Sequence, residues 1–437
     1  MSAVATAPKG LEVRQLAASL VERIVRDGLT IEESLRTASG IGQLESRDRS
    51  FLHVLLLTIF RHRGEIEWVL KSHLAKPLPR KSGPANFILW VGIAELLFLG
   101  VPVHAAIDQA VRSARTDRNA THFSGLVNAV LRKIAAQGKA DLESSKGPPL
   151  NTPGWLWWRW SQNYGAGYAR EIDKAHRNEP FLDISVKTDP EEWATRIGGM
   201  PLPTGSVRLS ADHAGVTELP GFSEGEWWVQ DAAAALPVRL LGDVRGREVL
   251  DLCAAPGGKT MQLIAAGASV TAVDSSPQRL SRLRENLART GMTAEIVEAD
   301  VRALGMTKLF DAVLLDAPCS ATGTIRRHPE LAYLKTEPQI LQLAKLQAEL
   351  LSCASARVAP GGLLVFCTCS LEPEEGEQQV EKFLAAQPGF EIVEPLVPGL
   401  PSEFVMPEGW IRTLPFMKIG ASEGLDGFFA VALRRRT

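Results

Sequence analysis

Six short apolar runs, separated by helical stretches, occupy the second half of this 437-residue chain and limit its possible folds more than any other feature. The runs are Glu248–Leu252, Ser269–Val273, Ala294–Glu298, Phe310–Leu315, Gly362–Phe366 and Phe428–Leu433. Pro277–Thr290 and Glu337–Arg357 are two of the helical stretches between them. Apolar runs of this length are typical of parallel strands that are buried on both faces. The alternation therefore predicts a mostly parallel sheet covered by helices on both sides.

The amino-terminal third has a different periodicity. Apolar residues recur every three or four positions from Val13 to Ile24, and similar segments continue to about residue 137. This spacing is typical of amphipathic helices and predicts a small helical bundle over residues 1–140. The bundle region carries 19 Lys and Arg against 12 Asp and Glu, whereas residues 141–437 carry 29 against 38. The basic excess suits a surface that contacts phosphates, although solvated helix faces could give the same count.

A segment rich in Pro and Gly, Lys146–Gly154, separates the bundle from the rest of the chain. It is followed by a tryptophan-rich stretch and then by Pro180–Val186, whose alternating pattern predicts a strand. We therefore divide the chain into a helical domain (1–140), a linker with a small α/β insert (141–225) and an α/β core (226–437).

The composition argues against several classes of protein. Phe87–Leu99 is the nearest candidate for a membrane span, but it is too short, and no basic-then-apolar leader begins the chain, so we expect a cytoplasmic location. Five cysteines, an odd number in a reducing compartment, predict no disulfide framework. Cys367 and Cys369 lack the paired spacing of a zinc ribbon, and we expect no bound metal.

Two cysteines follow the ends of predicted strands, Cys319 within Asp316–Gly323 and Cys369 within Phe366–Gly376. The carboxyl ends of parallel strands meet at one edge of a sheet, where ligands bind. We expect both thiols and the Asp316 carboxylate to converge there. Either thiol could act as a nucleophile if its thiolate is stabilised, and the spacing does not decide between them. The remaining cysteines have the pattern of ordinary buried residues: Cys253, Cys353 and Cys367.

A glycine-rich turn after the first strand of the core predicts a cofactor site. It matches neither the G-x-G-x-x-G pattern nor the P-loop, and it consists of Cys253, Ala254, Ala255, Pro256, Gly257, Gly258 and Lys259. Glycine lets the backbone approach a ligand closely, and the helix that follows directs its amino terminus at negative charge. Asp274 and Asp300 end the next two strands, where an acid can bind ribose hydroxyls, although aspartates also cap helices. The pattern indicates a cofactor that contains adenosine.

Methylation of carbon 5 of a pyrimidine would use all of these groups. That carbon becomes a good nucleophile after a thiolate adds to carbon 6, and protonation of nitrogen 3 favours the addition. A base must then remove the carbon 5 proton so that the thiol can leave. Cys369, Cys319 and Asp316 supply two thiols and a candidate ring acid.

The motifs that carry this chemistry resemble those of the RsmB/Nop2/Sun family of RNA 5-methylcytosine methyltransferases. The matching stretches cover about residues 229–437, and they are Asp251–Thr260, Asp316–Thr324, Ile325–Glu330, Thr368–Ser370 and Asp426–Phe429. The helical third, through Gly125–Arg132, resembles the domain related to the antitermination factor NusB. The resemblance implies a multidomain protein with a NusB-like all-α bundle, a small α/β RNA-binding insert and a Rossmann-like class I methyltransferase core.

The resemblance also implies roles for individual residues. S-adenosylmethionine would be the cofactor, with Asp274 at its ribose, Asp300 on the adenine side and Asp316 between the cofactor and the target base. Cys369 would be the nucleophile, and Cys319 would assist product release. The implied partner of the monomeric protein is RNA rather than DNA or a membrane. Small-subunit ribosomal RNA is expected, and transfer RNA or another ribosomal RNA is the alternative.

Two positions depart from the family pattern. Gly376 stands where asparagine is common, and Asp231–Ala235 replaces a more polar stretch. Both leave the catalytic set intact, but they bear on the choice of substrate. A ribosome-assembly or antitermination factor that uses the core as a binding platform is the non-enzymatic alternative, and the intact cysteine pair argues against it.

Overall fold

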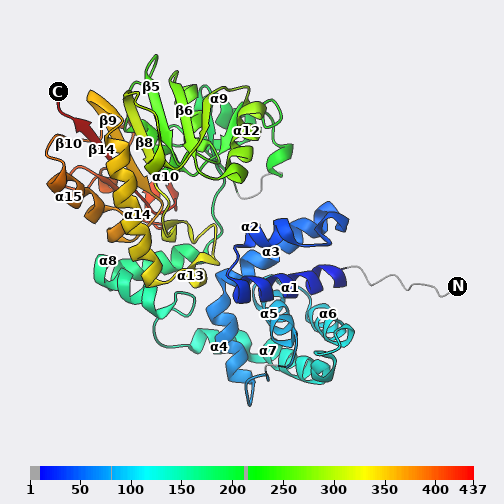
Figure 1. Cartoon of the computed structure of the whole chain (residues 1–437). Helices are drawn as coiled ribbons and strands as arrows, with labels where there is room; N and C mark the ends of the chain where they lie inside the picture. The colour runs from blue at the N-terminus through cyan, green and yellow to red at the C-terminus, as the bar shows by residue number, and fades with distance from the viewer. Residues whose placement is uncertain (1–9, 80, 211–214) are drawn as a thin grey trace. The chain divides into compact units, whose positions relative to one another are not determined.

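The computed structural model describes residues 10–79, 81–210 and 215–437, and it divides the chain into two compact units (Figure 1). The first unit spans the chain up to Arg177 together with His328–Leu334, and the second comprises Asn178–Arg327 and Lys335–Thr437. The finer division at residues 140 and 225 stays a prediction.

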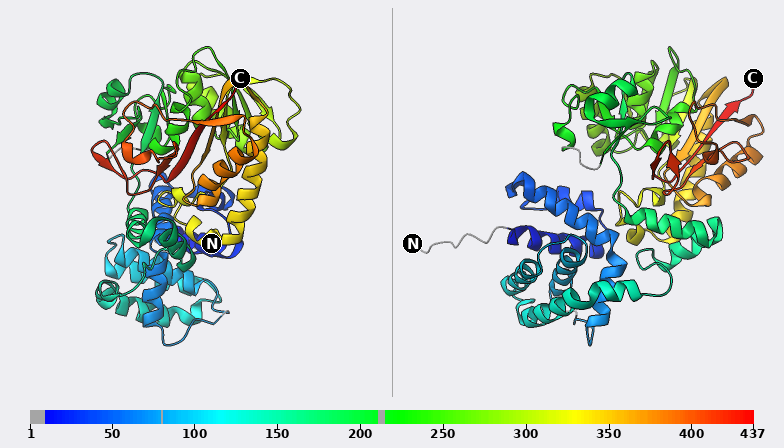
Figure 2. Two further views of the ribbon diagram at one scale, coloured as in Figure 1. Left: turned by 90° about the vertical axis from the view of Figure 1, so that its left-hand side faces the viewer. Right: turned by 180° about the vertical axis from the view of Figure 1, so that it is seen from behind.

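The first unit is the helical bundle that the periodicity predicts. α5 (Ala85–Leu97) is apolar on nearly every side and packs against α1, α3, α4, α6 and α7, which places it at the centre of the unit. Figure 2 shows the helices of this unit from two further sides, in blue to cyan. An all-round apolar helix of this kind is stable because its neighbours bury every face. The other helices are α1 (Leu11–Asp27), α2 (Ile31–Thr37), α3 (Ser46–Arg61), α4 (Arg63–His73), α6 (Val103–Thr116), α7 (Ser124–Ser144) and α8 (Gly154–Arg177).

A short segment from the second half of the sequence also belongs to the helical unit. It contains α13 (Leu331–Leu334) and packs against α2, α4 and the loop that precedes α8. The Glu330 carboxylate accepts a hydrogen bond from the backbone of Ile31 at 3.2 Å. The Tyr333 hydroxyl donates to the carbonyl of Asn151 at 2.9 Å, and the Arg63 guanidinium lies 4.4 Å from the centre of the Tyr333 ring. No periodicity in the sequence predicts this excursion.

The second unit begins with a small antiparallel sheet in the order β2-β3-β1-β4. Its core includes a buried ion pair in which the Arg208 guanidinium donates two hydrogen bonds of 2.7 Å to Asp183. The insert predicted before residue 225 is therefore an α/β element, and its last strand extends slightly further. Its elements are β1 (Asp183–Val186), α9 (Pro190–Ile197), β2 (Gly199–Pro201), β3 (Val207–Leu209) and β4 (Trp227–Val229).

The main sheet has the order β10-β14-β9-β8-β5-β6-β7, with β11 paired to β14. The five strands from β9 to β7 are parallel, and β14, β10 and β11 are antiparallel additions at one edge. The predicted mostly parallel sheet is confirmed, but the antiparallel direction of β14 and the strands β10 and β11 were not expected. The strands are β5 (Glu248–Leu252), β6 (Ser269–Asp274), β7 (Glu295–Glu298), β8 (Phe310–Asp316), β9 (Val358–Thr368), β10 (Phe390–Val393), β11 (Ile411–Thr413) and β14 (Phe428–Arg435), with a separate β12–β13 hairpin (Lys418–Ile419, Ser422–Glu423).

Helices cover both faces of this sheet, as the apolar strands predict. Val249 faces the layer of α10 (Ala232–Arg239) and α11 (Gly258–Ala265), while the adjacent Leu250 faces the opposite layer of α14 (Glu337–Ser355) and α15 (Glu377–Ala386). Figure 1 shows α14 alongside β8 and β9. α12 (Pro277–Thr290) contacts β6 and β7.

The strand order reverses next to β5, and in open α/β sheets such a reversal leaves a crevice at the carboxyl ends of the strands. The chain runs outward from β5 to β6 and β7, and then returns to place β8 on the other side of β5. Ligands of open α/β sheets bind at the carboxyl ends of the strands where the order reverses in this way. The predicted functional residues follow the ends of β5, β6, β8 and β9, which surround this point.

Candidate active site

Two cysteine side chains meet beyond the carboxyl ends of neighbouring parallel strands. Cys319 follows β8 and Cys369 follows β9, and their sulfur atoms are 3.4 Å apart. Both are half-buried free thiols. The structure thus brings together the two thiols that the sequence placed at strand ends. Across the described ranges, no cluster of three His, Cys, Asp or Glu side chains is arranged to hold a metal ion.

The contact between the sulfurs makes the two thiols unequal. The hydrogen bond to Cys369, together with burial, raises the pKa of the Cys319 thiol well above its usual value. Cys319 therefore keeps its proton to a higher pH than an isolated thiol, and either sulfur atom can donate in the contact. A neighbouring S–H donor stabilises a thiolate, which is the reactive form of cysteine.

Asp316 ends β8, three residues before Cys319, and forms an ion pair with Lys259. The Lys259 Nζ atom is 2.7 Å from Asp316 Oδ2. Burial alone would lower the pKa of the Lys259 ammonium, but the Asp316 carboxylate raises it above its usual value. Cys367, which the sequence analysis classed as an ordinary buried residue, contacts Asp316 Oδ1 with its thiol at 3.5 Å. The raised pKa keeps the Lys259 ammonium protonated beside the Asp316 carboxylate.

A buried glutamate that the sequence analysis did not single out joins the two cysteine loops. The Glu375 carboxylate accepts a hydrogen bond from the backbone N–H of Ser320 at 2.9 Å and from the Ser370 hydroxyl at 2.5 Å. The Ser320 hydroxyl and Gln347 also donate to it. Ser320 follows Cys319 and Ser370 follows Cys369, so Glu375 fixes the spacing of the two thiols. Glu375 belongs to an acidic run before α15, so the sequence pattern does not distinguish it from an exposed acid.

Replacing Glu375 with alanine is expected to lower kcat by about 10- to 100-fold, because the loops that carry both thiols lose their common acceptor. The free energy of unfolding should fall by about 1–3 kcal/mol, since several buried donors lose their partner. Glu375→Gln, which keeps part of the network, should lie between the variant and the wild type. Steady-state kinetics at saturating RNA, with cofactor affinity as the control, would test this positioning role. A folded alanine variant with wild-type kcat would contradict it.

The turn between β5 and α11 has the form of a cradle. Cys253 and Gly257 adopt left-handed backbone conformations, with φ of 59° and 105°, and α11 begins at Gly258. Below the turn, Asp251 is fully buried and accepts one hydrogen bond from the Thr260 hydroxyl at 2.6 Å. Its other carboxylate oxygen has no hydrogen-bond partner among the described residues, and burial raises the pKa of Asp251 to about 7. A buried acceptor left open in this way fits a ligand that carries a cationic group.

The two acids assigned to the cofactor differ in their surroundings. Asp274 is buried at the end of β6, where it accepts hydrogen bonds from the backbone of Ala255 at 3.2 Å and of Ser276 at 3.0 Å. Asp300 follows β7, is exposed to solvent and pairs with Arg302 at 2.7 Å. Asp274 therefore also supports the cradle itself, whereas Asp300 does not.

Asp274→Ala is expected to weaken binding of S-adenosylmethionine by about 1–3 kcal/mol, because buried hydrogen-bonding groups lose their partner. Calorimetric titration would measure the affinity, and thermal unfolding without cofactor would report the separate loss of support for Ala255. Asp300→Ala is the exposed comparison, and we expect a smaller effect. Unchanged affinity for the Asp274 variant would place the adenosine elsewhere.

Both departures from the family pattern have a structural explanation. The alanines after Asp231 form the buried helix α10. Asp231 itself forms an ion pair with Arg327, with 2.5 Å between a guanidinium nitrogen and Oδ2. Burial alone would raise the pKa of Asp231, but Arg327 and its neighbour Arg326 lower it to about 2. A Cβ atom at Gly376 would lie 2.7 Å from the Arg412 guanidinium. That guanidinium donates a hydrogen bond to the carbonyl of Ser370, the residue after Cys369. Neither departure removes a group from the crevice.

Two family models match the chain. One describes the 16S rRNA methyltransferases RsmB/F and matches residues 238–434, and the other describes the NusB family and matches residues 11–136. The matches fall on the α/β core and on the helical third, in agreement with the two resemblances noted in the sequence.

Curated relatives match over nearly the whole length. "Ribosomal RNA small subunit methyltransferase B" of Klebsiella pneumoniae subsp. pneumoniae is 36% identical, covering 98% of this chain and 99% of its own. The protein of the same name from Salmonella arizonae is 35% identical over 97% of this chain and 99% of its own.

Solved structures resemble the fold. The crystal structure of PH0851 superposes with a TM-score of 0.75 and 25% identity over 99% of this chain and 100% of its own. NSun6 from Pyrococcus horikoshii, crystallised with the S-adenosylmethionine analogue SFG, gives a TM-score of 0.56 at 22% identity, covering 65% of this chain and 98% of its own. The match to the methyltransferase family identifies S-adenosylmethionine as the cofactor of this protein.

Proposed function

This chain belongs to the RsmB/F family of 16S rRNA methyltransferases, and on that premise we propose that it methylates carbon 5 of a cytosine in small-subunit ribosomal RNA through a covalent thiolate adduct. The coarser function, an S-adenosylmethionine-dependent rRNA methyltransferase, follows from the family. The observation that supports the covalent mechanism best is the 3.4 Å separation of the Cys319 and Cys369 sulfur atoms.

The cofactor would lie in the cradle Cys253–Lys259, and when bound it supplies the methyl group. Asp274 would bind the ribose hydroxyls and Asp300 would lie on the adenine side. The open oxygen of Asp251 is suited to the cofactor's ammonium group, a role that the sequence analysis did not assign. Glycine at position 257 supports close approach, because its left-handed backbone carries no Cβ.

Cys369 would be the nucleophile. Its thiolate adds to carbon 6 of the cytosine, which makes carbon 5 electron-rich enough to accept a methyl group. The Lys259–Asp316 pair holds a proton at the crevice, and passing it through Asp316 to nitrogen 3 would stabilise the adduct. The thiolate brings one negative charge to the ring and the proton brings one positive charge, so the base stays neutral in the adduct.

Cys319 would complete the reaction. Once the Cys369 sulfur is bonded to carbon 6, it no longer forms the same contact with the Cys319 thiol. The largest cause of the raised pKa of Cys319 then disappears, and the thiol ionises more easily. After it has released its own proton to solvent, the Cys319 thiolate can accept the carbon 5 proton. The electrons of that C–H bond form the double bond between carbons 5 and 6 as the Cys369 sulfur leaves, and nitrogen 3 returns its proton to the Lys259–Asp316 pair.

The three predicted domains would divide the work. Residues 226–437 carry the chemistry, while the basic helical domain (1–140) and the small insert (141–225) would bind RNA phosphates. We expect a monomer, with no DNA or membrane as partner, and ribosomal RNA as substrate places the reaction in the cytoplasm. The target base must leave its stack to expose both faces, which costs least in weakly paired RNA.

Transfer of radiolabelled methyl groups to total RNA, followed by mapping of the modified nucleotide, tests the proposed substrate. We expect label at a cytosine of unmodified small-subunit ribosomal RNA. Transfer RNA made in vitro is the control substrate and should remain unlabelled. Preferential labelling of transfer RNA would overturn the choice of substrate while leaving the chemistry in place.

A further inference from the structure

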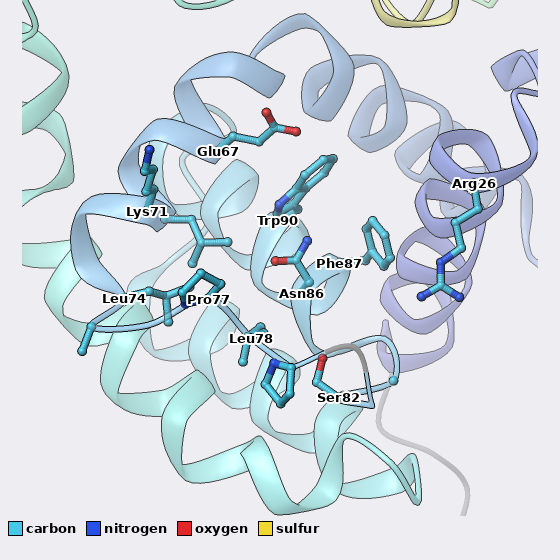
Figure 3. A pocket seen from close by; sticks show the side chains of 14 residues that line it. Arg26, Glu67, Lys71, Leu74, Pro77, Leu78, Ser82, Asn86, Phe87 and Trp90 are labelled. Atoms are coloured by element: carbon cyan, nitrogen blue, oxygen red, sulfur yellow. The ribbon is translucent and has the colours of Figure 1, made fainter.

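A hollow of about 690 Å³ lies in the helical unit, apart from the methyltransferase crevice (Figure 3). It is bounded by α4, α5 and the connection between them, and its inner wall includes Trp90 and Phe87. The two rings pack edge to face, with centroids 5.5 Å apart, and each exposes about a twentieth of its surface, 4% and 6%. Apolar hollows of this volume with a few polar groups are typical of small-ligand sites.

Two polar side chains of the hollow have unused hydrogen-bonding capacity. The Asn86 amide and the Ser82 hydroxyl line it, and neither has a hydrogen-bond partner among the residues that the structure describes. Figure 3 shows Asn86 directed into the space between Phe87 and the connecting loop. An amide presents a donor and an acceptor side by side, which matches the edge of a nucleobase.

The charges at the mouth are mostly positive and uncompensated. Lys71 lines the rim, and Lys76 and Lys81 flank lining residues of the connecting loop. All three are exposed and have no ion-pair partner among the described residues. Glu67, the acid of the rim, is neutralised by Arg63 at 2.8 Å. Such a mouth attracts phosphate groups and disfavours a cationic peptide.

We propose that this hollow binds an unpaired nucleobase of the substrate RNA, with the flanking phosphates on Lys71, Lys76 and Lys81. The proposal rests on the proposed function, since that function supplies the RNA. The base would lie against the apolar wall, and the Asn86 amide would hydrogen-bond its edge. Single-stranded nucleic acid is commonly held in this way, by an aromatic or apolar surface beside a basic track.

Asn86→Trp in the full-length protein would fill the hollow without removing a charge. We expect its affinity for a small-subunit ribosomal RNA fragment to fall by about tenfold, as for the loss of one stacked base. KM for RNA should rise while kcat and cofactor affinity stay unchanged. Lys71→Glu should weaken binding and flatten its dependence on salt, because fewer counterions are released. Lys382→Glu, the same charge change on α15 of the core, should bind RNA within about twofold of the wild type.

Photocrosslinking gives a second readout. RNA containing 4-thiouridine should crosslink to peptides of residues 70–90 in the wild type and lose this crosslink in Asn86→Trp. A folded Asn86→Trp protein with wild-type RNA affinity and crosslinks would overturn the proposal and leave a protein partner as the occupant. Methyl transfer by the wild type is measured in parallel. Transfer without any effect of Asn86→Trp refutes the hollow alone, whereas RNA binding at the hollow without transfer refutes the proposed function alone.

Discussion

Replacing Cys369 with alanine is expected to abolish methyl transfer, with kcat reduced by more than about a thousandfold, because no other group can form the bond to carbon 6. Affinity for S-adenosylmethionine should stay close to that of the wild type. The thiol acts on the base, while the cradle Cys253–Lys259 is built from a different loop. Single-turnover transfer to ribosomal RNA and calorimetric titration of the cofactor would measure the two effects.

Cys353→Ala is the matched control for this experiment. Cys353 is a free, half-buried thiol on α14, and the same substitution there removes a sulfur outside the crevice. We expect wild-type turnover from it. A Cys369→Ala enzyme that keeps a tenth of wild-type turnover would refute the assignment of the nucleophile.

Cys319→Ala should instead accumulate the covalent complex between the enzyme and the RNA. Addition through Cys369 and methylation can still occur, but the base that removes the carbon 5 proton is missing, so elimination stalls. Denaturing electrophoresis with substrate RNA and S-adenosylmethionine should reveal a retarded band. The change also removes the S–H donor 3.4 Å from Cys369, so we expect the adduct to form more slowly than in the wild type.

The double variant Cys319→Ala/Cys369→Ala separates this adduct from nonspecific crosslinks, because it should give no band. If Cys369→Ala accumulates the complex and Cys319→Ala does not, the two thiols have exchanged roles.

The strands and the meeting of the two thiols could be predicted because they depend on local pattern and on one rule of sheet topology. Apolar runs placed β8 and β9, and parallel neighbours bring their carboxyl ends to one edge. Cys319 and Cys369 therefore had to lie close if the two strands were adjacent. The pairing of β8 with β9 satisfies that condition.

The polar supports of the site could not be predicted in the same way. Glu375 lies in a run of acids and prolines that is typical of an exposed helix start, yet tertiary packing buries it between the cysteine loops. The same holds for Cys367, whose contact with Asp316 depends on the register of β9 against β8. Local composition carries no information about such long-range partners. Strand β10 was missed because Phe390–Val393 is short and contains Glu391.

The excursion of His328–Leu334 into the helical unit has a consequence for how the protein can be dissected. Leu331 and Ala332 are buried, and the Tyr333 hydroxyl bonds to Asn151. A fragment that begins after residue 177 would keep this segment and lose every surface that covers it. It would expose the apolar residues of this segment, which begins nine residues beyond Cys319. Poor solubility or low activity of such a fragment would therefore not report on RNA binding. The catalytic sequence therefore depends on the helical unit for its folding. Domain exchange between relatives should succeed when His328–Leu334 and the helices that enclose it are transferred together.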